Sequence, residues 1–414
     1  MNPARDFDIV LWGATGAVGR RAAYHLAGRI GESGLRWAIG GRNRDKLRAV
    51  GAALPPTDPP AAVLVGDSHD PAFMDLLAAR SRVIASTVGP FALYGSDLVA
   101  ACVANGTHYC DLSGESQWMR AMIDAHQPRA RQTGARILHA CGHDSIPSDL
   151  GVQVLQAAAK QRFGQPCKRV TTRVTAMKGG FSGGTAASFL NAMEIAAKDP
   201  GYMKLMADPY ALNPAGQRDG PDPPDRMMPV AVTYDEDLQV WTKPYFMASM
   251  NSKVVRRSNA LMGYPYGKDF RYRESAATRG GPGGWWSAMR YTLLTRCFLI
   301  LMAIPPSRAL LKRYVLPKSG EGPGADIRET GFYEIMQIGA LPDGRILKLK
   351  IHGQGDPGVE STSRMLVEAA LCLTEDADRI AVGGGFWTPA SGLGRLLLDR
   401  VSAHAGLSFS LLDP

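Results

Sequence analysis

Cysteine is scarce in this sequence, and it never occurs at the spacings that bind metals or build a disulfide framework. Six cysteines are present in 414 residues, and no Cys-x-x-Cys pair is among them. This usage is typical of reduced thiols in a cytoplasmic protein. The first residues lead directly into an apolar strand pattern with no secretory signal before it, so we expect a cytoplasmic location.

The sequence does not contain a complete set of ligands for a metal site. His139, Cys141 and His143 lie close together in the sequence, but a tetrahedral site needs a fourth ligand. No second Cys/His cluster supplies one, so we predict no metal.

Acidic residues are nearly missing from one segment. The net charge of the chain is +9, yet residues 251–318 hold 13 Lys and Arg against two acids, Asp269 and Glu274. Basic residues concentrated in one segment predict a local anionic partner. No recognised nucleic-acid-binding motif accompanies them, so we expect no nucleic-acid partner.

No uncharged apolar run is long enough to cross a bilayer. Residues 285–304 come nearest, but Arg290 and Arg296 near the middle would each cost about 2.5–3.5 kcal/mol there. Three interpretations stay open for the hydrophobic basic segment 285–318. It makes peripheral contact with the inner face of the plasma membrane, forms the wall of a site for a long acyl chain, or is a core helix. The basic flank suits lipid phosphate, coenzyme A or an acidic acyl carrier protein.

Glycine, in contrast, is concentrated directly after the first strand pattern. Residues 8–12 are followed by Gly13-Ala-Thr-Gly16-Ala-Val-Gly19 and then by a helical pattern. A strand, a glycine-rich turn and a helix in this order predict a dinucleotide-binding unit. Gly13 permits the tight turn, Gly16 lets the backbone approach the pyrophosphate, and Gly19 lets the helix pack closely on the strand. The helix start offers N–H groups to the phosphates.

The end of the second strand indicates which dinucleotide binds. An NAD site has an acidic residue there, whereas this chain has Gly40-Gly41-Arg42. A guanidinium binds a 2′-phosphate bidentately and a carboxylate repels it, so we predict NADP. The alternative is that Arg42 is a solvated turn residue. The predicted cofactor-binding residues are Gly13, Thr15, Gly16, Ala17, Val18, Gly19, Arg42, Asn43, Lys46, Asp67, Thr87, Val88, Gly89 and Pro90.

Strand and helix patterns alternate through the first part of the chain. We expect strands at 8–12, 35–39, 61–66, 83–87, 107–112 and 136–140, and helices at 71–79, 96–105 and 123–133. This alternation predicts an α/β fold, with a Rossmann-type doubly wound parallel sheet in an NADP-binding domain over residues 1–150.

A different pattern begins after residue 150. It contains a strand pattern at 169–177, a long loop at 213–229, a hairpin signal at 330–352 and a helix at 361–373. These elements predict a second, α+β domain over residues 151–385, built on an antiparallel sheet. We expect it to bind substrate and to mediate homodimer formation. A C-terminal helix within 386–414, with Thr388 as its N-cap and Pro389 at its first position, is expected to complete the first domain.

Eight motifs resemble those of the saccharopine dehydrogenase-like oxidoreductases, and more narrowly their trans-acting enoyl reductase branch. They lie at residues 13–19, 41–43, 88–91, 110–115, 142–149, 179–185, 355–358 and 388–390. The resemblance implies that NADPH delivers hydride to an enoyl thioester of lipid or polyketide synthesis, held on a partner synthase or acyl carrier protein. His143 stands where the family more often has an aromatic residue, so the resemblance gives it no special role.

This chemistry needs a hydrogen-bond donor near the thioester carbonyl and an acid for the α-carbon. The candidate catalytic residues are Ser113, Glu115, Asp144 and Ser145, which follow expected strands. The alternative is that they only cap turns. Two other functions stay open. One is a saccharopine dehydrogenase-type amino-acid oxidoreductase, against which the apolar run 285–304 argues. The other is a non-catalytic, membrane-associated NADP-binding protein.

Overall fold

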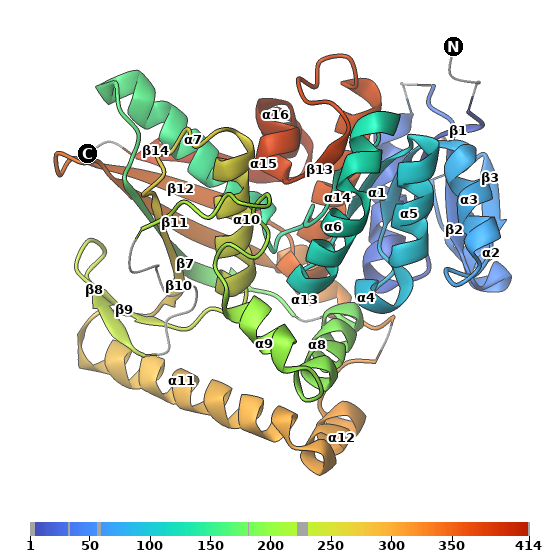
Figure 1. The fold of residues 1–414 in the computed structure, drawn as a ribbon. Coiled ribbons are helices and arrows are strands. Elements are labelled where there is room, and N and C mark those ends of the chain that lie inside the picture. Colours follow the sequence, from blue (N-terminus) through green and yellow to red (C-terminus); the bar gives the residue numbers. More distant parts are fainter. Residues whose placement is uncertain are drawn as a thin grey trace.

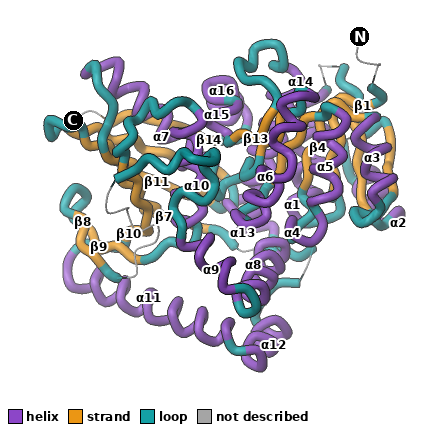
Figure 2. Tube along the Cα trace, viewed as in Figure 1, coloured by secondary structure: helices purple, strands orange, loops and turns teal. Residues whose placement is uncertain are grey.

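The structure is a computed structural model that describes residues 5–31, 34–55, 59–180, 182–221, 231–318 and 320–412. Two seven-stranded sheets lie at its centre and helices surround them (Figure 1). The strands form two separate groups, sheet A near the N-terminus and sheet B near the C-terminus (Figure 2). The chain therefore has the two-sheet architecture that the sequence predicts.

Sheet A is parallel throughout, which confirms the predicted doubly wound arrangement. Its strand order is β13-β6-β5-β4-β1-β2-β3. The strands are β1 (Phe7–Trp12), β2 (Trp37–Gly41), β3 (Ala62–Val65), β4 (Ser81–Ser86), β5 (His108–Asp111), β6 (Arg136–Leu138) and β13 (Gly385–Trp387).

Both faces of sheet A are buried, which explains why its strands are apolar runs. Side chains alternate along β1: Ile9 and Leu11 face one core, while Val10 and Trp12 face the other. The helices around the sheet are α1 (Ala17–Ile30), α2 (Arg44–Ala52), α3 (Pro71–Ala79), α4 (Phe91–Tyr94), α5 (Ser96–Asn105), α6 (Ser116–Thr133) and α14 (Thr362–Glu375).

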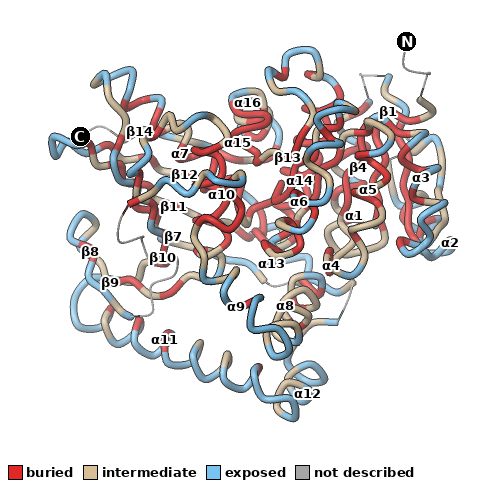
Figure 3. Tube along the Cα trace, viewed as in Figure 1, coloured by how far each residue is buried: buried red, intermediate tan, exposed pale blue. Residues whose placement is uncertain are grey.

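Helix α14 lies where the sequence alone did not place it. We expected a helix at 361–373 in the second domain, but α14 packs against α1 and against β1, β4 and β5 of sheet A. Most of α14 is buried (Figure 3), and its apolar side chains join the same core as those of α1. The stretch that we assigned to the second domain therefore contributes one helix to the first.

Sheet B is mixed rather than purely antiparallel. Its order is β14-β12-β11-β7-β10-β9-β8, and β7 and β10 pair in parallel because a long crossover connects them. The strands are β7 (Arg169–Lys178), β8 (Thr233–Asp235), β9 (Val240–Lys243), β10 (Arg271–Ala277), β11 (Phe332–Ala340), β12 (Ile346–Gln354) and β14 (Leu407–Leu412). The predicted hairpin is confirmed as β11–β12. Helices α7 (Ile146–Phe163) and α10 (Ala248–Leu261) pack on this sheet.

The C-terminal segment joins both sheets. Strand β13 pairs with β6 in sheet A, and β14 pairs with β12 in sheet B. Between them, Thr388 is the N-cap and Pro389 the first residue of α15 (Pro389–Gly392), as predicted, and α16 (Gly394–His404) packs against α14. Residues 413–414 of the predicted tail lie outside the described residues.

In the part of the chain that the structure describes, five helices and a π-helical turn lie outside the two cores. They are α8 (Gly183–Ala196), α9 (Pro200–Ala207), α11 (Gly281–Ala303), α12 (Pro305–Tyr314), α13 (Ala325–Thr330) and the turn η1 (Pro357–Ser361). The predicted loop at 213–229 falls partly outside the described residues, which exclude 222–230.

Helix α11 is exposed along most of its length (Figure 3), which rules out the core-helix interpretation of residues 285–304 for this chain on its own. Only Gly284, Ala288, Thr292 and Met302 are buried in it. Within the described ranges, no one helix has both the length and the hydropathy of a membrane span. The pair α11–α12 satisfies such criteria only jointly, and it is bent by 110°.

Candidate functional site

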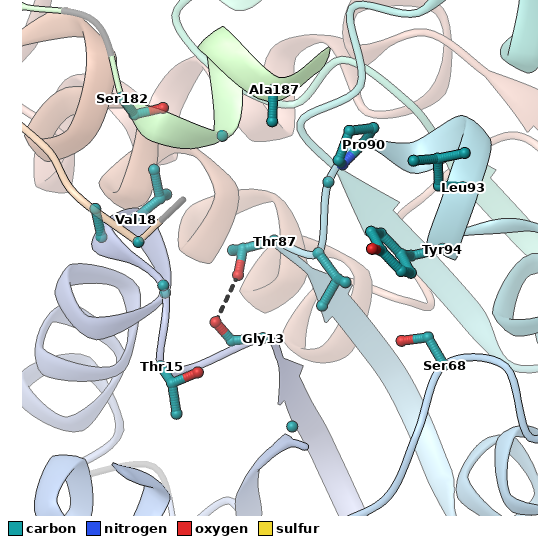
Figure 4. A pocket seen from close by; sticks show the side chains of 18 of the residues that line it. Gly13, Thr15, Val18, Ser68, Thr87, Pro90, Leu93, Tyr94, Ser182 and Ala187 are labelled. Carbon is teal, nitrogen blue, oxygen red and sulfur yellow. Dashed lines mark hydrogen bonds between the residues drawn. The ribbon is translucent and has the colours of Figure 1, made fainter. Parts of the chain in front are cut away.

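A cavity of about 400 Å³ opens at the carboxyl ends of β1 and β4. The strand order reverses between these strands, and ligands of open α/β sheets bind at such a switch point. Most of the predicted cofactor-binding residues line the cavity (Figure 4): Gly13, Thr15, Gly16, Ala17, Val18, Gly19, Arg42, Thr87, Val88, Gly89 and Pro90. The structure therefore brings the glycine-rich turn, the end of β2 and the loop after β4 together.

The glycines of the turn have different surroundings. Gly13 has a φ of +95°, and a Cβ there would lie 2.6 Å from Thr87 Oγ1. A Cβ on Gly19 would overlap the Gly13 carbonyl oxygen, so the fold itself requires both glycines. A Cβ on Gly16 would meet no atom closer than 3.5 Å. The space beside Gly16 is therefore open, as a backbone that receives a pyrophosphate requires.

The first turn of α1 presents its backbone to the cavity. Ala17 and Val18 line the cavity, and Gly16 at the N-cap has no side chain to occupy the helix start. The first turn contains no acidic residue. The positive end of the helix dipole is therefore available to an anion, which fits the phosphates of a dinucleotide.

Arg42 lines the cavity rather than pointing away from it. Its guanidinium carbon lies 5.7 Å from the centroid of the Tyr94 ring, which also lines the cavity. This stacking holds the planar group while its N–H donors stay available to a phosphate.

Three predicted cofactor-binding residues do not line the cavity: Asn43, Lys46 and Asp67, all of which are exposed. Asn43 Oδ1 accepts a hydrogen bond from the Lys46 backbone N (2.9 Å) as the N-cap of α2, and Asp67 Oδ1 accepts one from His69 N (2.9 Å). Their cofactor contacts stay predictions.

The loop after β4 forms one wall of the cavity. Thr87 Oγ1 donates a hydrogen bond to the Gly13 carbonyl oxygen (3.0 Å; Figure 4), which ties this loop to the glycine-rich turn. Val88 and Pro90 then present apolar groups to the cavity.

The candidate residues Ser113 and Glu115 are buried and do not line the cavity. Glu115 Oε1 accepts hydrogen bonds from Phe91 N (2.8 Å) and Ser188 Oγ (2.8 Å), and Oε2 accepts one from Ala92 N (3.0 Å). Burial raises the pKa of Glu115, and these hydrogen bonds partly oppose the rise. Glu115 thus joins α4 to α8, and its catalytic role stays a prediction.

Asp144 and Ser145 lie directly before α7, also away from the cavity lining. Ser145 Oγ donates to Asn251 Oδ1 (3.1 Å). Burial raises the pKa of Asp144 to about 6. A minor fraction of the molecules therefore carries a protonated Asp144 near neutral pH. The neighbouring His143 Nε2 lies 3.5 Å from the Tyr245 hydroxyl, and burial lowers the pKa of His143 to about 3, which keeps it neutral.

The opposite side of the cavity comes from residues after 181, beyond the predicted NADP-binding domain, and we did not predict it. We call this side the roof; it consists of Ser182, Gly184, Ala187, Leu190, Asn191, Glu194, Lys312, Gly320 and Glu321. Ser182 Oγ accepts from Thr185 N (3.2 Å) and caps α8. The motif at 179–185, of which Phe181 lies outside the described residues, was the sequence signal nearest to the roof. No local pattern pointed to Lys312.

Comparisons with known proteins agree with this geometry. Residues 9–138 match the family model of the saccharopine dehydrogenase NADP binding domain. A Mycobacterium tuberculosis protein, provisionally named a trans-acting enoyl reductase, is 40% identical over 98% of this chain and 97% of its own. The trans-acting enoyl reductase of Mycobacterium leprae is 35% identical over 96% of both chains. Apo saccharopine dehydrogenase (L-Glu forming) from Saccharomyces cerevisiae has a similar fold, with a TM-score of 0.53 at 12% identity over 98% of this chain and 100% of that one.

Proposed function

Because the chain belongs to the trans-acting enoyl reductases of the saccharopine dehydrogenase-like oxidoreductases, we propose that it reduces an enoyl thioester carried by a separate synthase or acyl carrier protein. It is an NADP-dependent oxidoreductase. When bound, NADPH supplies the hydride. The residues that fit the cofactor are the open backbone at Gly16, the uncapped start of α1 and the guanidinium of Arg42.

One observation supports an enoyl thioester as the substrate: the cavity wall beside the loop that follows β4 is apolar. Val88, Pro90, Ala187 and Leu190 line it there. An amino-acid substrate with several carboxylates needs fixed cations, and Arg42 and Lys312 are the two basic groups among the lining residues described. A thioester with an acyl chain suits this wall better.

A path for the acyl chain is suggested by aromatic rings beside the roof. Phe189 of α8 lies 5.5 Å from Phe246 and 6.0 Å from Phe298 of α11, measured between ring centroids. The Phe189 and Phe298 rings connect α8, which contributes to the roof, with the exposed apolar helix α11.

The reaction also needs a proton for the α-carbon. None of the candidates Ser113, Glu115, Asp144 and Ser145 lines the cavity, so the proton donor is not assigned among them. Glu115 fits better as a positioning residue, since both of its oxygens accept hydrogen bonds.

An enzyme assay tests the function directly. We expect loss of NADPH absorbance when the protein is mixed with enoyl thioesters, and a larger rate when the thioester is on an acyl carrier protein of a synthase without its own reductase. Saccharopine-type substrates with NADP are the negative control. Tight NADPH binding without turnover on any enoyl thioester, even beside the synthase, would favour the non-catalytic alternative.

We also propose that α11 and α12 make peripheral contact with an anionic lipid surface at the inner face of the membrane. Exposed apolar side chains gather there, including Trp286, Leu293, Leu294, Ile300 and Leu310. Besides Lys312, which lines the cavity, residues 281–314 contain four Arg and no acid. Apolar groups beside basic ones, with aromatic rings at one end, are typical of helices that lie in a membrane interface.

Vesicle flotation tests this contact. We expect the protein to float with vesicles that contain phosphatidylglycerol and not with phosphatidylcholine alone, and Leu293→Glu to reduce the floated fraction severalfold. Leu76→Glu is a matched control, because Leu76 is 53% and Leu293 60% exposed. Equal flotation of both variants would contradict the proposed surface.

Two further proposals concern residues 151–385. We propose that they bind the substrate and that they mediate homodimer formation, and light scattering would test the homodimer.

A further inference from the structure

The roof of the cavity carries a cation that has no ionic partner within the described ranges. Lys312 lies in the last turn of α12 and lines the cavity together with Glu194 and Glu321. Arg42 and Lys312 are the two basic residues of the lining, and neither makes an ion pair with another described residue. Two cations from distant parts of the chain therefore share one cavity, and no described carboxylate is paired with either of them.

Hydrogen bonds fasten the roof to the phosphate-binding turn. Arg20 of α1 donates from Nη1 to the Thr15 carbonyl oxygen (2.7 Å) and from Nη2 to the Gly320 carbonyl oxygen (3.2 Å). Gly183 N donates to the Glu321 carbonyl oxygen (2.9 Å), which joins α8 to the same stretch. The chain that follows Lys312 is thus held directly above the turn that faces the phosphates.

Phosphate is the ligand chemistry that suits this cation. NADP carries a diphosphate and a 2′-phosphate, and an ammonium group on a flexible stem binds phosphate as a point charge. Glu194 and Glu321 would repel these groups, and Lys312 is the roof residue that offsets them.

We propose that Lys312 binds a phosphate group of NADP from the roof, opposite Arg42 and the start of α1. This assignment rests on the proposed cofactor site. It means that the cofactor is held by cations from both parts of the chain, and that the second part of the chain contributes to nucleotide affinity as well as to the substrate side.

Titration of the full-length protein with NADPH and with NADH tests the assignment. We expect Lys312→Met to raise the Kd for NADPH about tenfold. Lys198→Met is the matched control, because Lys198 is an exposed cation just after α8 that does not line the cavity. An equal loss for NADH assigns the contact to the diphosphate, and a loss confined to NADPH assigns it to the 2′-phosphate.

A second measurement separates contact from a general effect of charge. NADP should protect Lys312 from an amine-acylating reagent, as mapped by mass spectrometry, and should leave Lys198 reactive. The assignment is overturned if Lys312→Met binds NADPH like Lys198→Met while Arg42→Met has lost affinity. If Arg42→Met also binds normally, the proposed cofactor site fails as a whole.

Discussion

Gly19→Ala should unfold much more easily than the natural protein, whereas Gly16→Ala should keep its fold and lose NADP. A methyl group on Gly19 would overlap the Gly13 carbonyl oxygen and approach Ala14 Cα to 2.9 Å. Both atoms belong to a turn that follows β1, which is paired on both sides with β2 and β4, so the backbone has little room to move. We expect a loss of about 3 kcal/mol in the free energy of unfolding.

Gly16→Ala should behave differently because the protein itself leaves room there. The nearest atom to an added Cβ is 3.5 Å away, and the backbone angles, φ −71° and ψ 168°, are open to any residue. The methyl group would instead occupy space where the pyrophosphate approaches. We expect a change of about 2 °C or less in Tm and a rise of about a hundredfold in the Kd for NADPH.

Thermal unfolding and NADPH fluorescence titration on the same two variants check this pair of outcomes. If both variants lose stability equally, or if Gly16→Ala binds NADPH normally, then the open space beside Gly16 does not serve a nucleotide.

The second large effect is expected at Glu368, a buried carboxylate in α14. Its side chain is fully buried, and Oε1 lies 2.8 Å from Arg29 Nε and 3.2 Å from His25 Nε2 of α1. Arg400 Nη1 of α16 lies 3.7 Å from Oε2. Glu368→Ala would remove the carboxylate that Arg29 and His25 contact, and Arg400 would keep only its pairs with Glu375 and Asp376. We expect a loss of about 3 kcal/mol in the free energy of unfolding.

A matched control lies on the same helix. Glu375 pairs with Arg400 at 2.7 Å but is 30% exposed, and Glu375→Ala should cost about 1 kcal/mol or less. Urea unfolding measures both variants. A similar loss for the two would mean that burial of Glu368 does not strengthen its contacts.

The contribution of Glu368 should also depend on pH. Burial alone would raise the pKa of this carboxyl, but the hydrogen bonds and charges of His25 and Arg29 outweigh burial and lower the pKa below its ordinary 4.5. A carboxyl with a lowered pKa stabilises the fold above the pKa of the unfolded chain, and this contribution is lost as the pH falls through the folded value. The stability difference between the natural protein and Glu368→Ala should therefore shrink as the pH falls below 4.5.

The first sheet and the cofactor turn could be read from the sequence because their signals are local. One short stretch contains an apolar strand, three spaced glycines and Arg42 at the end of the next strand. In the structure all of them belong to the unit β1-α1-β2. The position of α14 could not be read in this way. Its amphipathic pattern indicates one apolar face, but both sheets offer a surface to cover that face.

The roof was missed for the same physical reason. Lys312 reaches the cavity only because the connection from β7 to β10 and the helices that follow return over the nucleotide-binding turn. The parallel pairing of β7 and β10 depends on that long connection and leaves no periodic signal in either strand. Glu115 illustrates a related limit, since its place after a strand did not reveal that its carboxylate joins α4 to α8.

The placement of the last two strands restricts how this protein can move. Because β13 ends one sheet and β14 ends the other, a rotation that separates the two sheets would have to displace the helices α15 and α16 that link these strands, or detach an edge strand. A chain cut before residue 385 would lose both strands, and β6 and β12 would then become the exposed edges of their sheets.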